Sequence, residues 1–294
     1  MAPPPGSRVP PIASGAGHLL VQYDVLFCDV WGVVHDGVRA YAAATDALIR
    51  FRERGGTVIL LTNAPVPAHR VEAMLEARHV PQEAYDDIVS SGEIALAHLA
   101  DKRYGAVYFI GPRGRDAAFF ERVTADDAPL ERAEAVVCTG LNDDVNETVE
   151  SYRDVLAHAR ARGLPFVCAN PDLVVDVGGR LFLCAGALAD AYQHQGGTVF
   201  WAGKPHAAAY QTAKAAAERI RGRTVTPDKI RVVGDAVRTD LAGAATAGLD
   251  AVFVAGGIHR HEVMTGDAID PDRLAALFPP GTPPALAAMT GLAW

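Results

Sequence analysis

The chain has 294 residues, of which 50% are hydrophobic and 21% are charged, and its formal net charge is −8. This length allows one or two domains with a sizeable core. The negative charge and the lack of an extended basic stretch argue against a nucleic-acid partner held mainly through its phosphates. A small anionic ligand is still compatible, because a local cluster of donors can outweigh the global charge.

Three features of the sequence bear on the cellular location of the protein: the cysteines, the apolar runs and the composition of the N-terminus. The cysteines show no CxxC spacing and each lies in an apolar run, so we expect buried free thiols rather than a metal cluster or a disulfide framework. They are Cys28, Cys138, Cys168 and Cys184. No run approaches the ~18 to 20 apolar residues of a membrane span. We therefore expect a cytoplasmic protein with no membrane association, and we interpret residues 1–20, rich in Pro, Gly and Ala, as a flexible arm.

Short apolar runs alternate with Ala-rich helical stretches along most of the chain, which is typical of an α/β sheet with buried parallel strands. In the first third, we predict strands at 25–30 and 57–63 and helices at 42–54 and 68–78. The pair Gly55-Gly56 marks the end of the first of these helices.

The middle of the chain has the same alternation with one difference. Strands are predicted at 106–111, 135–140 and 165–170, and helices at 116–123 and 150–162. The run 173–184 carries Gly178-Gly179 between two short apolar stretches, which predicts a β-hairpin. Because a hairpin is antiparallel, we expect this section to form a separate mixed α/β unit.

The last third returns to regular alternation. Strands are predicted at 198–205, 230–236 and 250–257, the last of these being the final strand, and helices at 206–223 and 240–248. The simplest architecture is one open, Rossmann-like parallel sheet formed by residues 21–89 and 189–294. An inserted α/β module at residues 90–188 interrupts it.

Outside the predicted insert, polar side chains stand at the ends of four strands. They are Asp29, Thr62 with Asn63, Lys204, and Asp235 with Asp240. Ligands of open α/β sheets bind beyond the carboxyl ends of the strands, so we expect these side chains to meet at one edge. Paired carboxylates suit Mg²⁺, and a lysine and a threonine hydroxyl suit phosphate oxygens. Taken singly, each residue is more often a cap, a turn former or a solvated charge.

Four segments in this order resemble the haloacid dehalogenase-like (HAD) phosphatases of subclass IIA, the group that contains nucleotide and pyridoxal-phosphate phosphatases. The segments are DVWGVVHDG, LLTNAP, AGKP and GDAVRTDLAGAATAGLDAVFVAGG, and VCANPDLV resembles the end of that subclass's inserted cap. The resemblance runs from about Tyr23 to Gly257. It implies a Rossmann-like parallel-sheet core with an inserted α/β cap of the C2 type, and it suggests a homodimer formed through the cap.

The resemblance assigns phosphoryl chemistry to the first motifs. Asp29 matches the nucleophile that takes the phosphoryl group and also binds Mg²⁺. Thr62 matches the hydroxyl that holds phosphoryl oxygens, helped by the backbone around Asn63. Lys204 matches the lysine that neutralises charge on the nucleophile and the phosphate.

The remaining assignments concern the metal and the substrate. Asp235 matches a Mg²⁺ ligand, and Asp240 matches a second acidic residue at the metal. Asn170 and Asp172 lie in the cap turn that would face the site and help to select the substrate.

One position departs from the family's pattern, because Trp31 stands where the first motif has its second aspartate. In the family that residue gives a backbone carbonyl to Mg²⁺ and a carboxyl as general acid and base. The Trp31 carbonyl can still bind Mg²⁺, but the indole cannot supply acid–base help, which contributes roughly 10² to 10⁴ in rate. His35 and Asp36 are candidate replacements. The alternative interpretation is that both are ordinary polar residues of the turn after the first strand.

Other site motifs are incomplete. GGTVFWAGKP has glycine spacing that is wrong for a P-loop, FIGPRGRD has only two glycines of a dinucleotide motif, and there is no GxSxG elbow. We interpret His259 and His261 as residues of an exposed loop, because a metal site needs three or four ligands. That loop could still border the substrate pocket, since it follows the last predicted strand.

Two hypotheses of different classes follow. The first is a Mg²⁺-dependent phosphohydrolase that acts on a small phosphorylated metabolite through an aspartyl-phosphate, slowed by Trp31. The second is a catalytically impaired protein that binds a phosphorylated ligand as a regulatory or sensor module. Asp29 favours the first, because a binding module needs no nucleophile, and Trp31 is the reason to keep the second.

Overall fold

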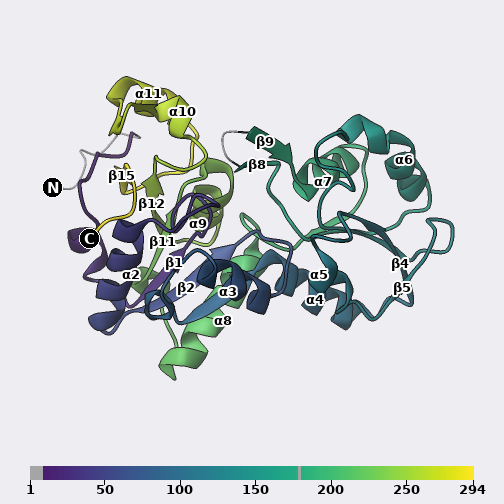
Figure 1. Cartoon of the computed structure of the whole chain (residues 1–294), viewed down its shortest axis with the longest axis horizontal. Helices are drawn as coiled ribbons and strands as arrows, with labels where there is room; N and C mark the ends of the chain where they lie inside the picture. The colour runs from purple at the N-terminus through teal and green to yellow at the C-terminus, as the bar shows by residue number, and fades with distance from the viewer. Residues whose placement is uncertain (1–8, 178–179) are drawn as a thin grey trace. The chain divides into compact units, whose positions relative to one another are not determined.

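The computed structural model describes residues 9–177 and 180–294, which form two compact units (Figure 1). The first unit contains the chain up to residue 62 together with residues 72–89 and 210–294. The second contains residues 63–71 and 90–209. The chain therefore leaves the first unit and returns to it, which is the topology of an insertion.

A six-stranded sheet of order β15-β12-β11-β1-β2-β3 forms the centre of the first unit. Its strands are β1 (Val25–Cys28), β2 (Thr57–Thr62), β3 (Asp87–Ser90), β11 (Ile230–Gly234), β12 (Asp250–Val254) and β15 (Ala287–Met289). From β15 to β2 every neighbouring pair is parallel, and these strands lie side by side in Figure 1. Strands β1, β2 and β11 are buried along their whole length, as their apolar sequences require. The predicted parallel sheet is confirmed.

Helices and short turns connect these strands. The helices are α1 (Gly17–Leu20), α2 (Ala42–Glu53), α3 (Ala68–Glu76), α8 (Ala207–Arg221), α9 (Ala242–Thr246), α10 (Arg260–Val263) and α11 (Pro271–Leu277). Shorter elements are the 3₁₀ turns Gln82–Ala84 and Pro227–Lys229, the π-helical turn Val237–Leu241, and the small pair β13 (Met264–Thr265) and β14 (Ala268–Ile269). Helix α2 contacts β2 and buries the apolar residues Leu48 and Phe51 of its inner face.

The second unit has its own five-stranded sheet, of order β10-β7-β6-β4-β5, in which the pairings are parallel. Its strands are β4 (Ala106–Ile110), β5 (Asp126–Asp127), β6 (Ala135–Cys138), β7 (Phe166–Cys168) and β10 (Val199–Trp201). Its helices are α4 (Ser91–Lys102), α5 (Ala117–Phe120), α6 (Arg153–Ala161) and α7 (Ala185–His194), with a 3₁₀ turn at Val149–Tyr152. Phe166 and Tyr192 are among the fully buried side chains of its core.

The predicted hairpin is present in the second unit. Strands β8 (Val174–Val177) and β9 (Arg180–Leu183) pair antiparallel, with Val174 opposite Leu183. Its predicted turn, Gly178-Gly179, lies outside the described residues. The section is therefore mixed, as expected, although the sheet beside the hairpin is parallel.

The predicted boundary after residue 188 needs a correction. Strand β10 pairs with β7 in the second sheet, with Val199 beside Phe166 and Trp201 beside Cys168. Helix α7 also contacts β7. The expectation that residues 189–294 all join the core sheet is therefore wrong for these two elements, and the second unit reaches residue 209. A short apolar run suits a buried strand of either sheet, so the sequence pattern did not say which sheet β10 joins.

The interpretation of residues 1–20 as a flexible arm is wrong for the part that the structure describes. Ala16 and Leu20 are fully buried. The Ala13 backbone N–H donates to the carbonyl of Ala288 at 2.9 Å, and that of Ala16 donates to the carbonyl of Ala293 at 2.7 Å. These bonds attach the segment to β15 and to the C-terminal residues. The strand predicted at 250–257 is therefore not the last one, because β15 follows it in the chain and pairs with it. Residues 1–8 of the predicted arm lie outside the described residues.

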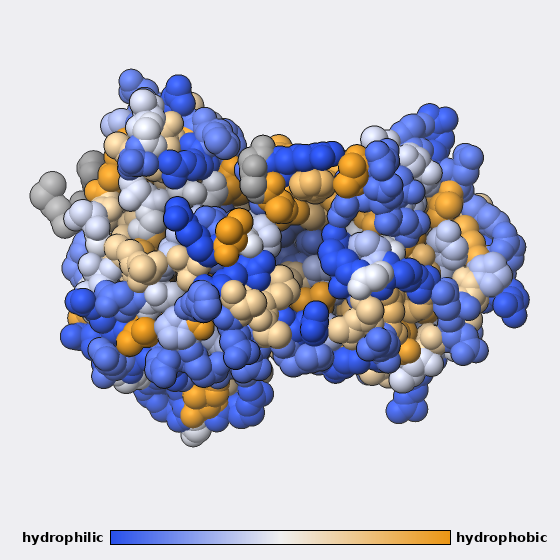
Figure 2. All heavy atoms as spheres, in the orientation of Figure 1, coloured by the Kyte–Doolittle hydropathy of each residue, from blue (hydrophilic) through white to orange (hydrophobic). Residues whose placement is uncertain are grey.

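The surface and the cysteines agree with an ordinary globular chain. Figure 2 shows hydrophilic residues over much of the visible face, with hydrophobic residues mixed among them. All four cysteines are buried and free, as predicted. Within residues 9–177 and 180–294, no helix has both the length and the apolar character needed to cross a membrane.

Candidate active site

Asp29 stands directly after the buried strand β1 and is itself 7% exposed. Its backbone N–H donates to the carbonyl of Val233 at 2.9 Å, which continues the parallel pairing of β1 with β11 beyond the last residue of β1. The carboxylate is therefore carried on a rigid sheet edge rather than on a free loop.

Asp235 and Asp240 come from the segment after β11. Asp235 is 5% exposed, and its Oδ2 accepts a hydrogen bond from the backbone N–H of Ile258 at 2.7 Å. Asp240 is 1% exposed, lies in the π-helical turn, and accepts a hydrogen bond at Oδ2 from the backbone N–H of Ala236 at 3.1 Å. The Tyr210 hydroxyl donates to the Asp240 carbonyl at 3.0 Å and anchors this turn.

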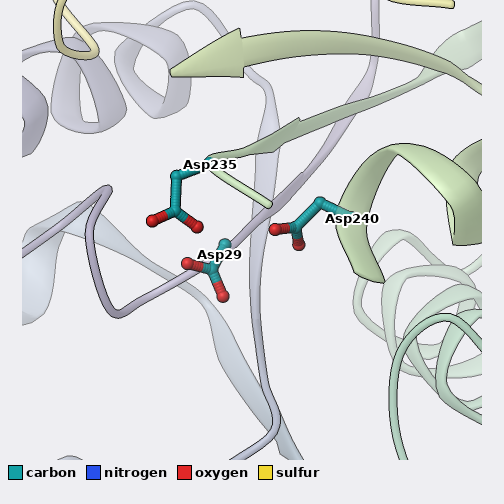
Figure 3. Close-up of side chains that lie close together, drawn as sticks. All are labelled: Asp29, Asp235 and Asp240. Atoms are coloured by element: carbon teal, nitrogen blue, oxygen red, sulfur yellow. The ribbon is translucent and has the colours of Figure 1, made fainter. Parts of the chain in front are cut away.

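The three carboxylates converge. One oxygen from each of Asp29, Asp235 and Asp240 lies within 4.8 Å of the other two. Figure 3 shows the three side chains close together. The structure thus brings together three carboxylates from two adjacent parallel strands, β1 and β11, and the turn that follows β11.

Two glycines allow this convergence. A Cβ atom added at Gly32 or at Gly257 would overlap the Asp235 carboxylate. Gly32 also has a φ of +86°, a left-handed conformation that favours glycine. The backbone therefore approaches Asp235 more closely than any other residue type would allow.

The donor set of this cluster fits Mg²⁺. Like charges at such separations disfavour simultaneous ionisation in a buried site, and a cation relieves that cost. Each side chain offers only oxygen, which a hard cation prefers, and Mg²⁺ takes one or two carboxylates while keeping waters and substrate oxygens.

In the loop after Asp29, the Trp31 indole packs against other residues of the same loop. The indole ring meets the His35 ring edge-on, with centroids 5.2 Å apart and an interplanar angle of 74°. It also lies against Gly37, where a Cβ would overlap the indole. The indole is thus a packing element of the loop that follows Asp29.

The two candidate replacements for the acid–base group have structural partners in the same loop. His35 is 2% exposed, and its Nδ1 accepts a hydrogen bond from the backbone N–H of Gly37 at 2.9 Å. Oδ1 of Asp36 accepts from the backbone N–H groups of Val38 and Arg39, each at 2.8 Å. Burial opposes ionisation of Asp36, but these N–H groups outweigh it and lower its pKa. The contacts favour the interpretation of both as turn residues.

Burial, helped by the nearby charge of Arg78, lowers the pKa of His35 from 6.5 to about 4. Unfolded chains therefore bind a proton at His35 before folded chains do, and stability present above pH 6.5 is lost as the pH falls toward 4. We predict a loss of up to about 3 kcal/mol in the free energy of unfolding over this range from His35 alone. Urea unfolding at several pH values measures it.

His35→Asn is the matched control for this prediction, because its Oδ1 can accept the Gly37 hydrogen bond without titrating. The variant should lose less stability on acidification than the wild type. Parallel pH profiles for the two proteins would contradict the proposed burial of a neutral histidine.

Thr62 ends β2, the neighbour of β1, and is 7% exposed. Its position at the same edge of the sheet as Asp29 is the one expected from the strand order. Asn63 follows it in the chain and belongs to the second unit, as do Asn170, Asp172 and Lys204.

Within the second unit, the Asn63 side chain connects two of the predicted site residues. Its Nδ2 donates to Oδ1 of Asp172 at 2.9 Å and to the Lys204 carbonyl at 3.1 Å. Its Oδ1 accepts the Lys204 backbone N–H at 2.8 Å. Asn170 accepts at Oδ1 from the backbone N–H of Asp172 at 3.2 Å. Both amide hydrogens of Asn63 are thus used inside the protein, so its side chain fixes Asp172 and Lys204.

Sequence reasoning missed the residues that surround Asp235. Gly32, Gly257 and Ile258 contact its carboxylate, as the close approaches and the hydrogen bond show. The Gly256-Gly257 pair after β12 was the available signal, because paired glycines at a strand end often mark a close backbone approach.

Comparison with known proteins assigns the chain to a family. A haloacid dehalogenase-like hydrolase model matches residues 26–123, and a HAD-hydrolase-like model matches residues 201–278. A solved hydrolase of the haloacid dehalogenase-like family from Brucella suis 1330 is 40% identical, covers 96% of this chain and 100% of its own, and superposes with a TM-score of 0.83. The chain belongs to the haloacid dehalogenase-like hydrolases. The resemblance and the fold class predicted from it are confirmed.

Other relatives of this haloacid dehalogenase-like hydrolase have more specific names. The ribonucleotide monophosphatase NagD of Escherichia coli (strain K12) is 26% identical over 242 residues, which cover 79% of this chain and 88% of that protein. A glycerol phosphate phosphatase from Mycobacterium tuberculosis, solved in complex with magnesium, is 26% identical. Its alignment covers 87% of this chain and 78% of that one, with a TM-score of 0.61.

Proposed function

We propose that this haloacid dehalogenase-like hydrolase is a Mg²⁺-dependent phosphohydrolase that acts on a small phosphorylated metabolite. The observation that carries the proposal is the meeting of three buried carboxylates, Asp29, Asp235 and Asp240, at the carboxyl edge of a parallel sheet. Two relatives named as phosphatases, one of them solved with magnesium, support it.

Asp29, Asp235 and Asp240, together with the Trp31 backbone carbonyl, are the proposed ligands of Mg²⁺. When bound, the ion would offset the repulsion among the carboxylates and polarise a phosphoryl oxygen. Thr62, at the end of the neighbouring strand, is proposed to donate its hydroxyl to a phosphoryl oxygen.

Asp29 is the proposed nucleophile. One of its carboxylate oxygens attacks phosphorus, forming an acyl-phosphate bond while the bond from phosphorus to the ester oxygen of the substrate breaks. The departing oxygen takes its proton from water, because Trp31 has no acidic proton to give. Water then attacks the same phosphorus, the bond to Asp29 breaks, and inorganic phosphate leaves as Asp29 is regenerated.

The roles proposed for residues of the second unit rest on the sequence motifs that contain them. Lys204 is proposed to neutralise the phosphoryl charge, and Asn170 and Asp172 to select the substrate, with the second unit as the cap. The hydrogen bonds of Asn63 support a positioning role for it, because they hold Lys204 and Asp172. The proposed homodimer is tested by light scattering, where a monomer would exclude it.

The alternative of a binding or sensor module is less favoured. Its motive was Trp31, whose indole packs on Gly37 and His35 and so has a structural use. A module that only binds would not need Asp29 buried beside two further carboxylates, an arrangement that has an electrostatic cost.

Hydrolysis of p-nitrophenyl phosphate with Mg²⁺ and with EDTA tests the proposed function. We expect turnover that depends on Mg²⁺, and Asp235→Asn should raise the required Mg²⁺ concentration by roughly tenfold or more. Undiminished turnover in EDTA would exclude the metal-dependent mechanism. No turnover with Mg²⁺ on this substrate, nor on a panel of sugar and nucleotide monophosphates, would favour the binding module.

A further inference from the structure

The segment that follows β12, residues 256–262, contacts the Asp235 carboxylate of the cluster. Its Ile258 N–H donates to Oδ2 of Asp235 at 2.7 Å. Gly257 approaches the same carboxylate so closely that a side chain there would overlap it. The position of this segment therefore determines where the Asp235 carboxylate lies.

His259 connects this segment to the turn that carries Asp240. The backbone N–H of Val237 donates to Nε2 of His259 in a long hydrogen bond of 3.4 Å. Nδ1 lies 2.8 Å from Oε1 of Glu262. Because Nε2 accepts, it carries no hydrogen, so the proton is on Nδ1 and is donated to Glu262.

Both ring nitrogens of His259 are thus used inside the protein, although 19% of the side chain remains exposed. With both nitrogens engaged in this way, the ring has no lone pair left for a metal ion. Its partner Val237 lies between Asp235 and Asp240 in the chain and is the first residue of the π-helical turn. One imidazole thereby joins the two segments that carry these carboxylates.

We propose that His259 is a positioning residue that holds Asp235 and Asp240 in the arrangement that binds Mg²⁺, with Glu262 fixing the tautomer of the ring. The proposal rests on the proposed metal-dependent function. It follows the general behaviour of outer residues around metal ligands, whose loss typically weakens metal binding by about 10 to 100-fold. His259 has no contact with the reacting atoms in this account.

The test compares His259→Ala, His259→Gln and His261→Ala with the wild type. His261 is the matched control, since it is an exposed histidine two positions along the same segment. Calorimetric titration with Mg²⁺, in the absence of any substrate, measures the dissociation constant. Thermal unfolding without Mg²⁺ shows whether each variant is folded, and the Mg²⁺ dependence of turnover separates KM for the metal from kcat.

We expect His259→Ala to weaken Mg²⁺ binding by about tenfold or more, with unfolding of the metal-free protein close to that of the wild type. His259→Gln should recover part of the loss, because its amide can accept from Val237 and donate to Glu262. His261→Ala should bind Mg²⁺ as the wild type does. In turnover, His259→Ala should raise KM for Mg²⁺ more than it lowers kcat.

Unchanged Mg²⁺ affinity in His259→Ala, or an equal loss in His261→Ala, would overturn the inference. Because the titration needs no substrate, the inference and the proposed function fail separately. If the wild type binds Mg²⁺ more tightly than His259→Ala but hydrolyses no phosphate ester, the inference is supported and the proposed phosphohydrolase activity is excluded. A wild type that binds no Mg²⁺ would overturn the inference.

Discussion

Trp31→Asp is expected to raise the rate of phosphate-ester hydrolysis by roughly 10² to 10⁴ for substrates with poor leaving groups. The change places a carboxyl where the family's first motif carries its general acid and base. The gain in kcat/KM should be much smaller with p-nitrophenyl phosphate, because kcat/KM reports the transfer of the phosphoryl group to Asp29 and nitrophenolate leaves without protonation. Values of kcat/KM for p-nitrophenyl phosphate and for an alkyl phosphate, measured side by side, give the comparison.

The structure adds a cost to this gain. The Trp31 indole packs against His35 and Gly37, and truncating a packed aromatic side chain typically costs about 3 to 5 kcal/mol when it is fully buried. Trp31 is only half-buried, so the free energy of unfolding should fall by less. Trp31→Phe keeps an aromatic ring and is the control, for which no rate gain is expected. Equal rates for Trp31→Asp and the wild type on the alkyl phosphate would mean that acid–base help is not what the site lacks.

Asp29→Asn is expected to lower kcat by at least about a thousandfold, because removal of a nucleophile abolishes the covalent route. Folding should survive the change. Asn has nearly the same volume, and it removes one carboxyl group from a buried cluster in which one oxygen of each member lies within 4.8 Å of the others, so it lowers the repulsion within the cluster. We therefore expect the free energy of unfolding, measured in urea without Mg²⁺, to stay level or rise.

This pair of measurements separates catalysis from structure. A variant that is as stable as the wild type and yet inactive assigns Asp29 to the reaction itself. Retained turnover in Asp29→Asn would instead indicate direct attack by water, with the carboxylates serving only to hold a metal. If the variant does not fold, the Asp29 carboxylate is needed to stabilise the edge of the sheet.

The sequence was most informative where chemistry and sheet topology coincide. Asp29 and Asp235 each follow a buried apolar run, and parallel strands bring their carboxyl ends to one edge, so their proximity followed from pattern alone. The antiparallel pair β8–β9 also followed from the sequence, because two glycines between apolar runs are a local signal.

Other features depend on contacts with distant parts of the chain, which a local sequence pattern does not predict. Strand β10 has the apolar composition of any buried strand, and only its pairing with β7 assigns it to the second sheet. The composition of residues 9–20 is typical of a flexible segment, but Ala16 and Leu20 are buried against other parts of the chain. His259 was interpreted as a loop residue, and its bond to Val237 joins positions that are far apart in sequence.

The central claim is that Asp29 attacks phosphorus, and acid quenching followed by peptide mass spectrometry tests it most directly. Wild-type protein mixed with p-nitrophenyl phosphate and Mg²⁺ is quenched at short times, and the peptide containing Asp29 is examined for a phosphoryl group. Because Trp31 cannot activate water for the second step, we predict that the aspartyl-phosphate accumulates on Asp29 and is absent from Asp29→Asn. Steady release of nitrophenol by the wild type with no phosphoryl group on that peptide, and at an equal rate by Asp29→Asn, would contradict the account.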